Sequence, residues 1–355
     1  MVYLDRLTQK RSNVSAISHI VAYSPDGPRG DLVRSKELQV DIRNLMLTCR
    51  VHGKIVDDRD KEAEYPEELL LEFKKEHEDR IRMLTEIRED AQTHVLLVQA
   101  PIDGRDFAID ETKAFQALLP KYPAEEKAEL IDLSSLALSA TAEGFFPLMA
   151  QSLAEQVRAL LRRRAGKARV KTLSVFALAP VPLLVHLGYE LGDIEHVDLY
   201  QKHRRGQEDW TWKKEEALEE FYEVTRPKNE VSESPVALVL SLSCDVKDQE
   251  VSAAVGQNCR WYGIRAKEPG LDFLSSRERL EVFGYELRKL LPKVRNATGH
   301  DVPVHVFAAV PAPAAIELGR RIKGFDPAFV IYEYDKPSER YRAALTVNLR
   351  KQDLK

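Results

Sequence analysis

The feature that most constrains the fold of this chain is an internal repeat. A set of residues recurs 131 positions later without a gap: Val175, Phe176, Ala177, Pro180, Pro182, Leu187 and Gly188 match Val306, Phe307, Ala308, Pro311, Pro313, Leu318 and Gly319. Each copy is typical of a strand, a Pro-x-Pro turn and a helix that carries a glycine. Because both prolines and the glycine keep their register, chance does not explain the match, and the chain is predicted to contain two copies of one structural unit.

Strand and helix patterns alternate around the repeat. Short apolar segments, typical of strands, lie near residues 93–102, 170–180, 196–201, 235–246, 302–311 and 329–335. Helical patterns lie between them, one ending near residue 164 and one over about 276–291. Alternation of this kind predicts a Rossmann-like sheet. The predicted fold class is therefore mixed α/β, with tandem Rossmann units at residues 92–230 and 235–355 behind an N-terminal module of residues 1–80.

A long helix is predicted between the N-terminal module and the first unit. Pro66 suits its first turn, and apolar side chains recur at helical spacing from Tyr65 to about Asp90. They are Leu70, Phe73, His77, Ile81 and Leu84. This helix is either a connector or the seam of a dimer.

Composition excludes several classes of protein. Among the 355 residues, no apolar run reaches the roughly 18 residues of a membrane span. Three scattered cysteines cannot build a disulfide framework, so we expect a cytoplasmic protein. The formal charge of −4 divides into +4 for residues 1–56 and −8 for the rest, so the net charge does not exclude a nucleic-acid partner.

Tandem α/β units place the carboxyl ends of their strands together, which is where such sheets bind ligands. Helix N-termini at these ends attract anions, so a pair of sites would suit a ligand with two phosphates. Residues at strand ends and in nearby cation–aromatic pairs are the candidates for binding: Gln99, Asp103, Arg105, Pro180, Tyr200, Gln201, Lys202, Arg204, Trp210, Trp212, Ser243, Asp245, Lys247, Arg260, Trp261, Pro311 and Ala312. Each tryptophan has an alternative interpretation as a half-buried core residue.

The N-terminal module carries a second group of candidate residues. His19, Asn44, Cys49, His52 and Asp57 follow the order of a ββα-metal nuclease. In that chemistry a neutral imidazole deprotonates water, an amide orients the imidazole, and a divalent ion held by His or Asp stabilises the phosphate charge. The alternatives remain open: His19 could be a buried structural residue, and one Cys-x-x-His is only half of a zinc site.

These residues resemble a known family. The stretches HIVAYSPDGPRGD, NLMLTCRVHGKIVDD and YPEELLLEFKKEHE resemble the HNH endonuclease domain that is fused to SAVED sensor domains in bacterial cyclic-oligonucleotide-based anti-phage systems (CBASS). The stretches YQKHRRGQEDWTW and VHVFAAVPAPAAIELGRR resemble SAVED, which consists of two CARF-like Rossmann units. The resemblance covers residues 1–80 and about 92–350.

The resemblance implies a ligand-activated nuclease. A cyclic di- or trinucleotide such as cyclic GMP–AMP would bind SAVED and promote assembly of homodimers into tetramers or higher oligomers. The HNH modules would then cut double-stranded DNA with Mg²⁺ or Mn²⁺, Zn²⁺ being an alternative. His19 would be the general base, Asn44 the orienting residue, and Cys49, His52 and Asp57 the metal-binding segment.

One position departs from the family pattern. The family usually reads Cys-x-x-His-His, and the second histidine, which resembles the catalytic metal ligand, is replaced here by Gly53. Since glycine has no side chain to bind a metal, cleavage should be impaired unless Asp57 or Asp58 compensates. The alternative function is a cyclic-nucleotide-binding, oligomerising protein with an inactive HNH module.

Overall fold

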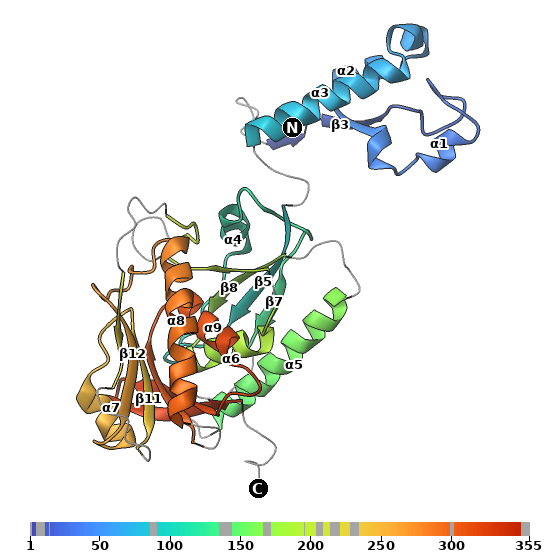
Figure 1. Ribbon diagram of the computed structural model, residues 1–355. Coiled ribbons are helices and arrows are strands. Elements are labelled where there is room, and N and C mark those ends of the chain that lie inside the picture. The colour runs from blue at the N-terminus through green and yellow to red at the C-terminus, as the bar shows by residue number, and fades with distance from the viewer. Residues whose placement is uncertain are drawn as a thin grey trace. The chain divides into compact units, whose positions relative to one another are not determined.

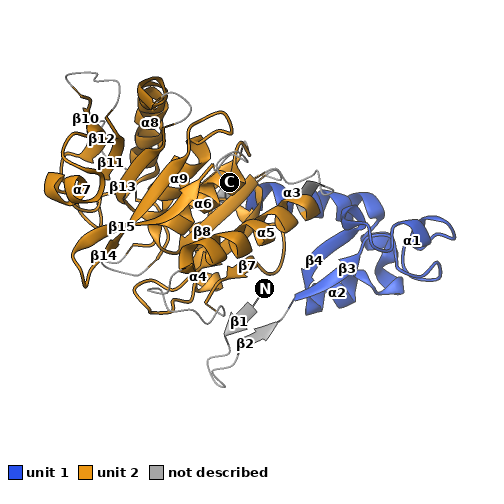
Figure 2. Cartoon of the chain, turned by 90° about the horizontal axis from the view of Figure 1, so that it is seen from below, with its two compact units in different colours: residues 1–88 blue, residues 89–355 orange. Residues whose placement is uncertain are grey.

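The structure is a computed structural model of a chain that divides into two compact units, residues 1–88 and 89–355 (Figures 1 and 2). It describes residues 2–4, 11–13, 15–85, 91–134, 144–165, 172–194, 196–203, 209–213, 221–227, 234–298 and 302–348. Within these ranges, no helix combines the length and the apolarity that crossing a membrane requires.

The N-terminal unit is built on an antiparallel strand pair followed directly by a helix. β3 pairs with β4 so that His19 lies opposite Leu45, and α2 begins at the residue after β4. The elements of this unit are β1 (Val2–Leu4), β2 (Arg11–Asn13), β3 (Ser15–His19), α1 (Arg34–Glu37), a 3₁₀ turn (Ile42–Asn44), β4 (Leu45–Cys49), α2 (Arg50–Val56), a 3₁₀ turn (Arg59–Glu64) and α3 (Glu67–Thr85).

Arg29 holds these elements together. Its guanidinium group donates hydrogen bonds to the carbonyl oxygens of Ile20, Val56 and Tyr65, at 2.7, 3.0 and 3.3 Å. These carbonyls follow β3, end α2 and precede α3. One half-buried cation therefore satisfies backbone acceptors from three segments.

The predicted connector helix is α3, which begins two residues after Tyr65; residues 86–90 lie outside the described part of the chain. Leu70 is fully buried and packs with Ile20 and Val56. Phe73 and Ile81 remain 44% and 45% exposed, so among the described side chains of the predicted apolar stripe only Leu70 is buried.

The 89–355 unit contains two sheets. The first has the order β6-β5-β8-β9, with β7 also pairing with β5, and the second has the order β10-β12-β11-β13-β14-β15. The strands and helices are β5 (Gln92–Gln99), α4 (Glu111–Ala117), β6 (Tyr122–Pro123), β7 (Glu129–Asp132), α5 (Phe145–Ala165), β8 (Thr172–Leu178), α6 (Val181–Leu191), β9 (Val197–Tyr200), β10 (Tyr222–Thr225), β11 (Val236–Ser241), α7 (Asp248–Val255), β12 (Arg260–Ala266), α8 (Arg277–Thr298), β13 (Val304–Ala309), α9 (Ala312–Arg321), β14 (Phe329–Asp335) and β15 (Arg340–Val347).

The two sheets repeat one topology. The order β5-α4-β7-α5-β8-α6-β9 recurs as β11-α7-β12-α8-β13-α9-β14, and the strands within each copy run parallel. Antiparallel strands β10 and β15 extend the second sheet at its two edges. Because β10 pairs with β12, residues 222–225 belong to the second sheet, although the sequence placed them with the first unit. The mixed α/β class agrees with the prediction.

The two copies meet where α6 crosses α9, and the repeated glycines lie at this crossing (Figures 1 and 2). A Cβ atom on Gly188 would lie 2.0 Å from the carbonyl oxygen of Ile316, and one on Gly319 would lie 1.9 Å from that of Val185. Only glycine permits this approach of the two backbones. Around it, one continuous core joins both sheets, with Val175 in the first and Val306 in the second among its members.

We expect Gly188→Ala and Gly319→Ala each to lower the free energy of unfolding by about 3 kcal/mol, since the methyl group would force the helices apart. Chemical denaturation followed by circular dichroism measures this. Gly324→Ala is the matched control, because a Cβ there meets nothing within 4 Å. Equal unfolding midpoints for the three variants would contradict the close helix contact.

Candidate functional site

A cavity of about 730 Å³ opens at the carboxyl ends of β5, β8 and β14. Both copies of the repeat line it: Asp103 and Pro180 follow strands of the first sheet, and Glu333 belongs to the last strand of the second copy. The remaining lining residues are Pro101, Gly104, Gly144, Phe145, Phe146, Pro147, Tyr334, Asp335, Lys336, Pro337, Arg342, Ala343 and Ala344. The cavity therefore lies where parallel sheets bind their ligands.

The 21-residue helix α5 begins at this cavity. Gly144, with φ at +85°, turns the chain into the helix, and Phe145 and Phe146 form its first residues. The backbone N–H groups of a first turn have no partner within the helix, and the helix dipole is positive there. α6 also starts at the cavity, after its N-cap Pro180, which has no side-chain capping bond. The two helix starts favour an anionic ligand.

Two cations at the cavity are each paired with a carboxylate. Lys336 Nζ lies 2.5 Å from Asp103 Oδ2, which joins the second copy to the first, and the Arg342 guanidinium lies 2.7 Å from Asp335. Both cations are more than half exposed, so a phosphate can reach them from solvent. Surface pairs of this kind are weak and exchange partners easily.

Glu333 is the third carboxyl group of the cavity. Its pKa is raised to about 7, mainly by burial and also by the charge of Asp103, while the charge of Lys336 acts in the opposite direction. In the β14–β15 pair its neighbour is Arg342, whose guanidinium group binds Asp335 instead. Glu333 has no hydrogen bond or ion pair with any residue that the structure describes.

Of the predicted sensor residues, Asp103 and Pro180 line the cavity. Gln99 is buried beside it, where its amide donates to Asp132 Oδ2 at 2.8 Å and accepts from the Ile109 N–H at 3.1 Å. It holds the loop that follows β5 rather than facing the cavity. Arg105 is exposed and does not line the cavity.

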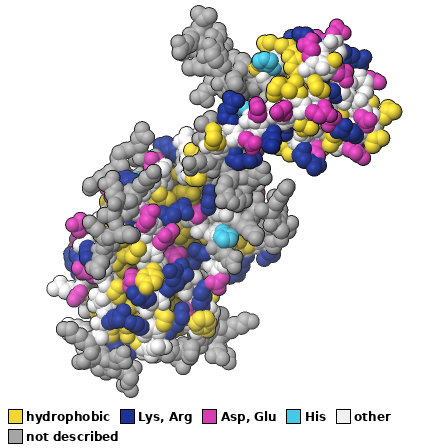
Figure 3. Space-filling view, turned by 45° about the horizontal axis from the view of Figure 1, so that its top comes forward, with side chains coloured by type: hydrophobic (Ala, Val, Ile, Leu, Met, Phe, Trp, Pro, Cys, Tyr) yellow, Lys and Arg dark blue, Asp and Glu magenta, His cyan; other side chains and the backbone are white. Residues whose placement is uncertain are grey.

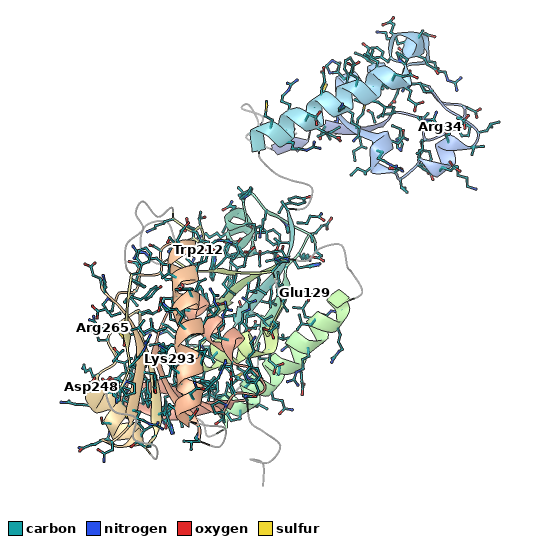
Figure 4. The ribbon with its side chains drawn as sticks, in the orientation of Figure 1. Arg34, Glu129, Trp212, Asp248, Arg265 and Lys293 are labelled. Carbon is teal, nitrogen blue, oxygen red and sulfur yellow. The ribbon has the colours of Figure 1, made fainter. Side chains whose placement is uncertain are left out.

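The residues predicted around β9 belong to the core instead. Trp210 is 1% exposed, and both it and Tyr200 pack on Phe176, with ring centroids at 5.2 and 4.3 Å. Trp212 donates its Nε1–H to the Leu199 carbonyl, so its polar atom is occupied by the sheet edge (Figure 4). The buried rings of Tyr200 and Trp210 are not available to stack on a base, which corrects the interpretation from the sequence, whereas Trp212 is half-buried and does not line the cavity.

Two further candidates of this segment lie beside that core. The Lys202 ammonium lies over the Trp210 ring at 5.7 Å, and the Gln201 amide donates to the Lys202 carbonyl. Arg204 lies outside the described residues.

The candidates of the second copy are spread over three places. Asp245, two residues beyond Ser243, forms an ion pair with Arg265 at 2.7 Å, and Lys247 precedes α7. Arg260 lies at the amino end of β12, where it donates to the Ser234 carbonyl, and neighbouring Trp261 packs on the α7 side of the sheet. Pro311 and Ala312 begin α9. None of these seven residues lines the cavity.

The sequence missed Glu333, Lys336 and Arg342. The segment 329–335 was recognised as a strand, so its end could have been searched for polar residues as the other strand ends were. The antiparallel partner β15, which brings Arg342 to the cavity, has no counterpart in the first copy of the repeat, so the sequence did not reveal it.

In the N-terminal unit, Asn44 is buried and joins two loops. Its Oδ1 accepts from the Val21 N–H at 2.7 Å, and its Nδ2 donates to the carbonyls of Val21 and Leu38. It does not contact the His19 ring. His19 is half-buried at the end of β3, and its Nε2 lies 3.1 Å from the Gln39 carbonyl oxygen. Asn44 thus orders the backbone that follows His19, not the imidazole itself.

The residues around Gly53 do not fit a metal ion. Cys49 Sγ and His52 Nδ1 lie 3.1 Å apart, as two donors on the first turn of α2, and Asp57 caps the other end of that helix. Among the described residues, no three His, Cys, Asp or Glu side chains are grouped so that they could hold a metal. Gly53 is buried, and a Cβ there would meet the hydroxyls of Thr48 and Ser18 at 3.1 and 3.2 Å.

The raised pKa of Glu333 predicts a pH-dependent stability. The folded protein keeps this proton up to about pH 7, whereas the unfolded chain loses it near the ordinary value of 4.5. The stability that the group contributes is full below pH 4.5 and lost as the pH rises through 7. We expect Glu333→Gln, measured by urea unfolding, to gain about 2 kcal/mol relative to the native protein between pH 5 and pH 8. Parallel pH curves would contradict this; Glu339→Gln, in the turn of the same hairpin, controls for the loss of a surface charge.

Comparison with known proteins identifies the larger unit. The family model described as "SMODS-associated and fused to various effectors sensor domain", or SAVED, matches residues 153–347, from α5 to the end of β15. No curated protein matches the chain significantly.

The similar solved structures are Cap4 receptors that contain a SAVED/CARF domain. That of Acinetobacter baumannii with the cyclic trinucleotide 2′3′3′-cAAA is 12% identical, with a TM-score of 0.48, covering 89% of this chain and 67% of that one. Another structure of that receptor is 11% identical, with a TM-score of 0.47 and coverages of 88% and 64%. The Moraxella osloensis receptor is 13% identical, with a TM-score of 0.42 and coverages of 88% and 63%. This chain spans about two thirds of the length of these chains, and the similarity is remote.

The repeated α/β topology and the family match agree over the same residues. The match extends over more than half of the 355 residues, and the chain belongs to the SAVED family of sensor domains.

Proposed function

We propose that the 89–355 unit binds a cyclic oligonucleotide in the cavity at the junction of the two copies. The observation that carries this proposal is the composition of the cavity: two helix starts, two exposed cations and aromatic side chains lie around one space of about 730 Å³. This volume is typical of pockets for small molecules. A single mononucleotide site would not need both copies of the repeat.

Each part of the cavity suits one part of such a ligand. Phosphates would bind at the start of α5 and beside Lys336 and Arg342, which can leave their carboxylate partners. A base would lie against Phe146, which is half-buried at the cavity. Basic and acidic side chains are interspersed on the face that Figure 3 shows, so the cavity rather than a broad charged surface supports the proposal.

We expect Lys336→Ala to weaken binding of a cyclic di- or trinucleotide by about tenfold, because it removes a cation from the ligand phosphates. Isothermal titration calorimetry measures the affinity. Lys293→Ala, an exposed lysine on α8, which contributes nothing to the cavity, is the matched control (Figure 4). Equal affinities of the two variants would place the ligand elsewhere, and no binding of any ring by the native protein would overturn the proposal.

A second proposal concerns the N-terminal unit. We propose that it is an HNH-type module that cleaves double-stranded DNA when the bound ring assembles the chain into homodimers and tetramers, as an effector of anti-phage defence. The β3–β4–α2 arrangement, with His19 at the end of β3, supports this proposal. His19 would accept the proton of the attacking water. Among the described residues no third metal ligand lies beside Cys49 and His52, which opposes the proposal and leaves the alternative of a sensor with an inactive module.

Gly53→His tests the nuclease proposal. The new Cβ would press on two hydroxyl groups that can rotate away, and the imidazole would add the donor that the family pattern has at this position. We expect the variant to degrade plasmid DNA with Mg²⁺ or Mn²⁺ and a cyclic oligonucleotide at least about tenfold faster than the native protein.

Gly53→Ala is the control, since it introduces the same Cβ without a metal donor. If the histidine variant leaves plasmid DNA intact with every cyclic oligonucleotide that it binds, the nuclease proposal is wrong. The alternative of a sensor with an inactive module is then favoured.

A further inference from the structure

The chemistry of Glu333 supports a further inference about which base of the ligand is recognised, and this inference rests on the proposed sensor function. β14 alternates its side chains between two faces. Ile331 belongs to the main apolar core, and Tyr332 stacks on Phe307 on the opposite face. Glu333 therefore lies on the face of Ile331, at the point where the core opens into the cavity.

The cations near Glu333 are engaged elsewhere. Lys336 binds Asp103, and Arg342, the cross-strand neighbour of Glu333, binds Asp335. Among the residues that the structure describes, none donates a hydrogen bond to the Glu333 carboxyl group. Because Glu333 is half-buried and lines the cavity, a ligand there can supply the hydrogen bonds that no described residue gives to its carboxyl group.

The missing donor cannot be a phosphate, which offers only acceptors and repels a carboxylate. Each ribose of a cyclic oligonucleotide keeps one free hydroxyl group and so offers a single donor, whereas two donors side by side can come only from the N–H groups of a base. Guanine presents two adjacent donors on its Watson–Crick edge, N1–H and N2–H, and these match the two oxygens of a carboxylate. Adenine and cytosine present one amino donor beside a ring acceptor, and the single N–H of uracil lies between two carbonyl oxygens. The carboxylate thus favours guanine over the other three bases.

We propose that Glu333 selects a guanine base of the cyclic oligonucleotide. The cavity then divides by chemistry: the carboxyl group at the end of β14 binds the base edge, while the start of α5 and the two exposed cations bind phosphate. The second copy of the repeat supplies the selectivity, since Glu333 belongs to its last strand.

The test compares cyclic di-GMP, cyclic GMP–AMP, cyclic di-AMP and cyclic tri-AMP by isothermal titration calorimetry on the full chain at pH 8, above the pKa of about 7 of Glu333, so that its carboxyl group is ionised. The native protein should bind the guanine-containing rings at least about tenfold more tightly than the adenine rings. Glu333→Gln should lose this preference, because its amide offers one donor and one acceptor, which match adenine instead. Glu339→Gln, in the turn of the same hairpin and outside the cavity, should keep it.

The outcomes separate this inference from the proposed function. If rings bind but the native protein does not prefer guanine, or if Glu333→Gln changes all affinities equally, the selectivity is overturned and the sensor remains. If no ring binds the native protein, the sensor proposal itself falls and this inference with it. The preference of the native protein is measured without any variant, so a misfolded Glu333→Gln would not remove the test.

Discussion

Where α6 crosses α9, each helix has a glycine against a carbonyl of the other, and the two backbones touch without side chains between them. Gly188 and Gly319 occupy equivalent places in the two copies, so the crossing is close to symmetric. Contact at this distance leaves little freedom in angle or register, because any side chain larger than hydrogen would overlap with backbone atoms. The relative placement of the two sheets follows from it.

The position of the cavity is a consequence of this crossing. α6 follows β8 and α9 follows β13, so fixing the helices fixes the strand ends that lead into them. The last strand of the second copy, β14, then ends beside the loop after β5, where Lys336 meets Asp103. A ligand at this place touches both copies, and a change in their relative position would change the cavity. Ligand binding in this cavity would therefore depend on the glycine contact through the same elements.

Much of the larger unit could be predicted from the sequence because the same strand–turn–helix pattern occurs in it twice. Continuous apolar runs such as 236–241 are buried on both faces, which only strands at the centre of a parallel sheet require. The antiparallel edge strands β10 and β15 have no such pattern, and the sequence placed β10 in the first copy although it belongs to the second sheet. The aromatic candidates illustrate a different limit: Trp210 was selected because tryptophan stacks on bases, but the same ring fills a core against Phe176. Residue type alone does not distinguish these uses, since both bury one ring face.

In the N-terminal unit, the motif residues that the fold requires differ from those that catalysis would require. Arg29, at the centre of the Gly-Pro-Arg-Gly-Asp stretch, donates hydrogen bonds to three backbone carbonyls. Asn44 donates to the backbone carbonyls of Val21 and Leu38, in the two loops that it joins. These residues would be needed for the fold whether or not the unit cleaves DNA, so their presence is weak support for catalysis. His19 differs, because its half-buried ring makes a single hydrogen bond to the protein and stabilises little. It lies at the end of β3, next to Ser18, whose hydroxyl lies against Gly53, so the nuclease proposal rests on His19 and Gly53 rather than on Arg29 and Asn44.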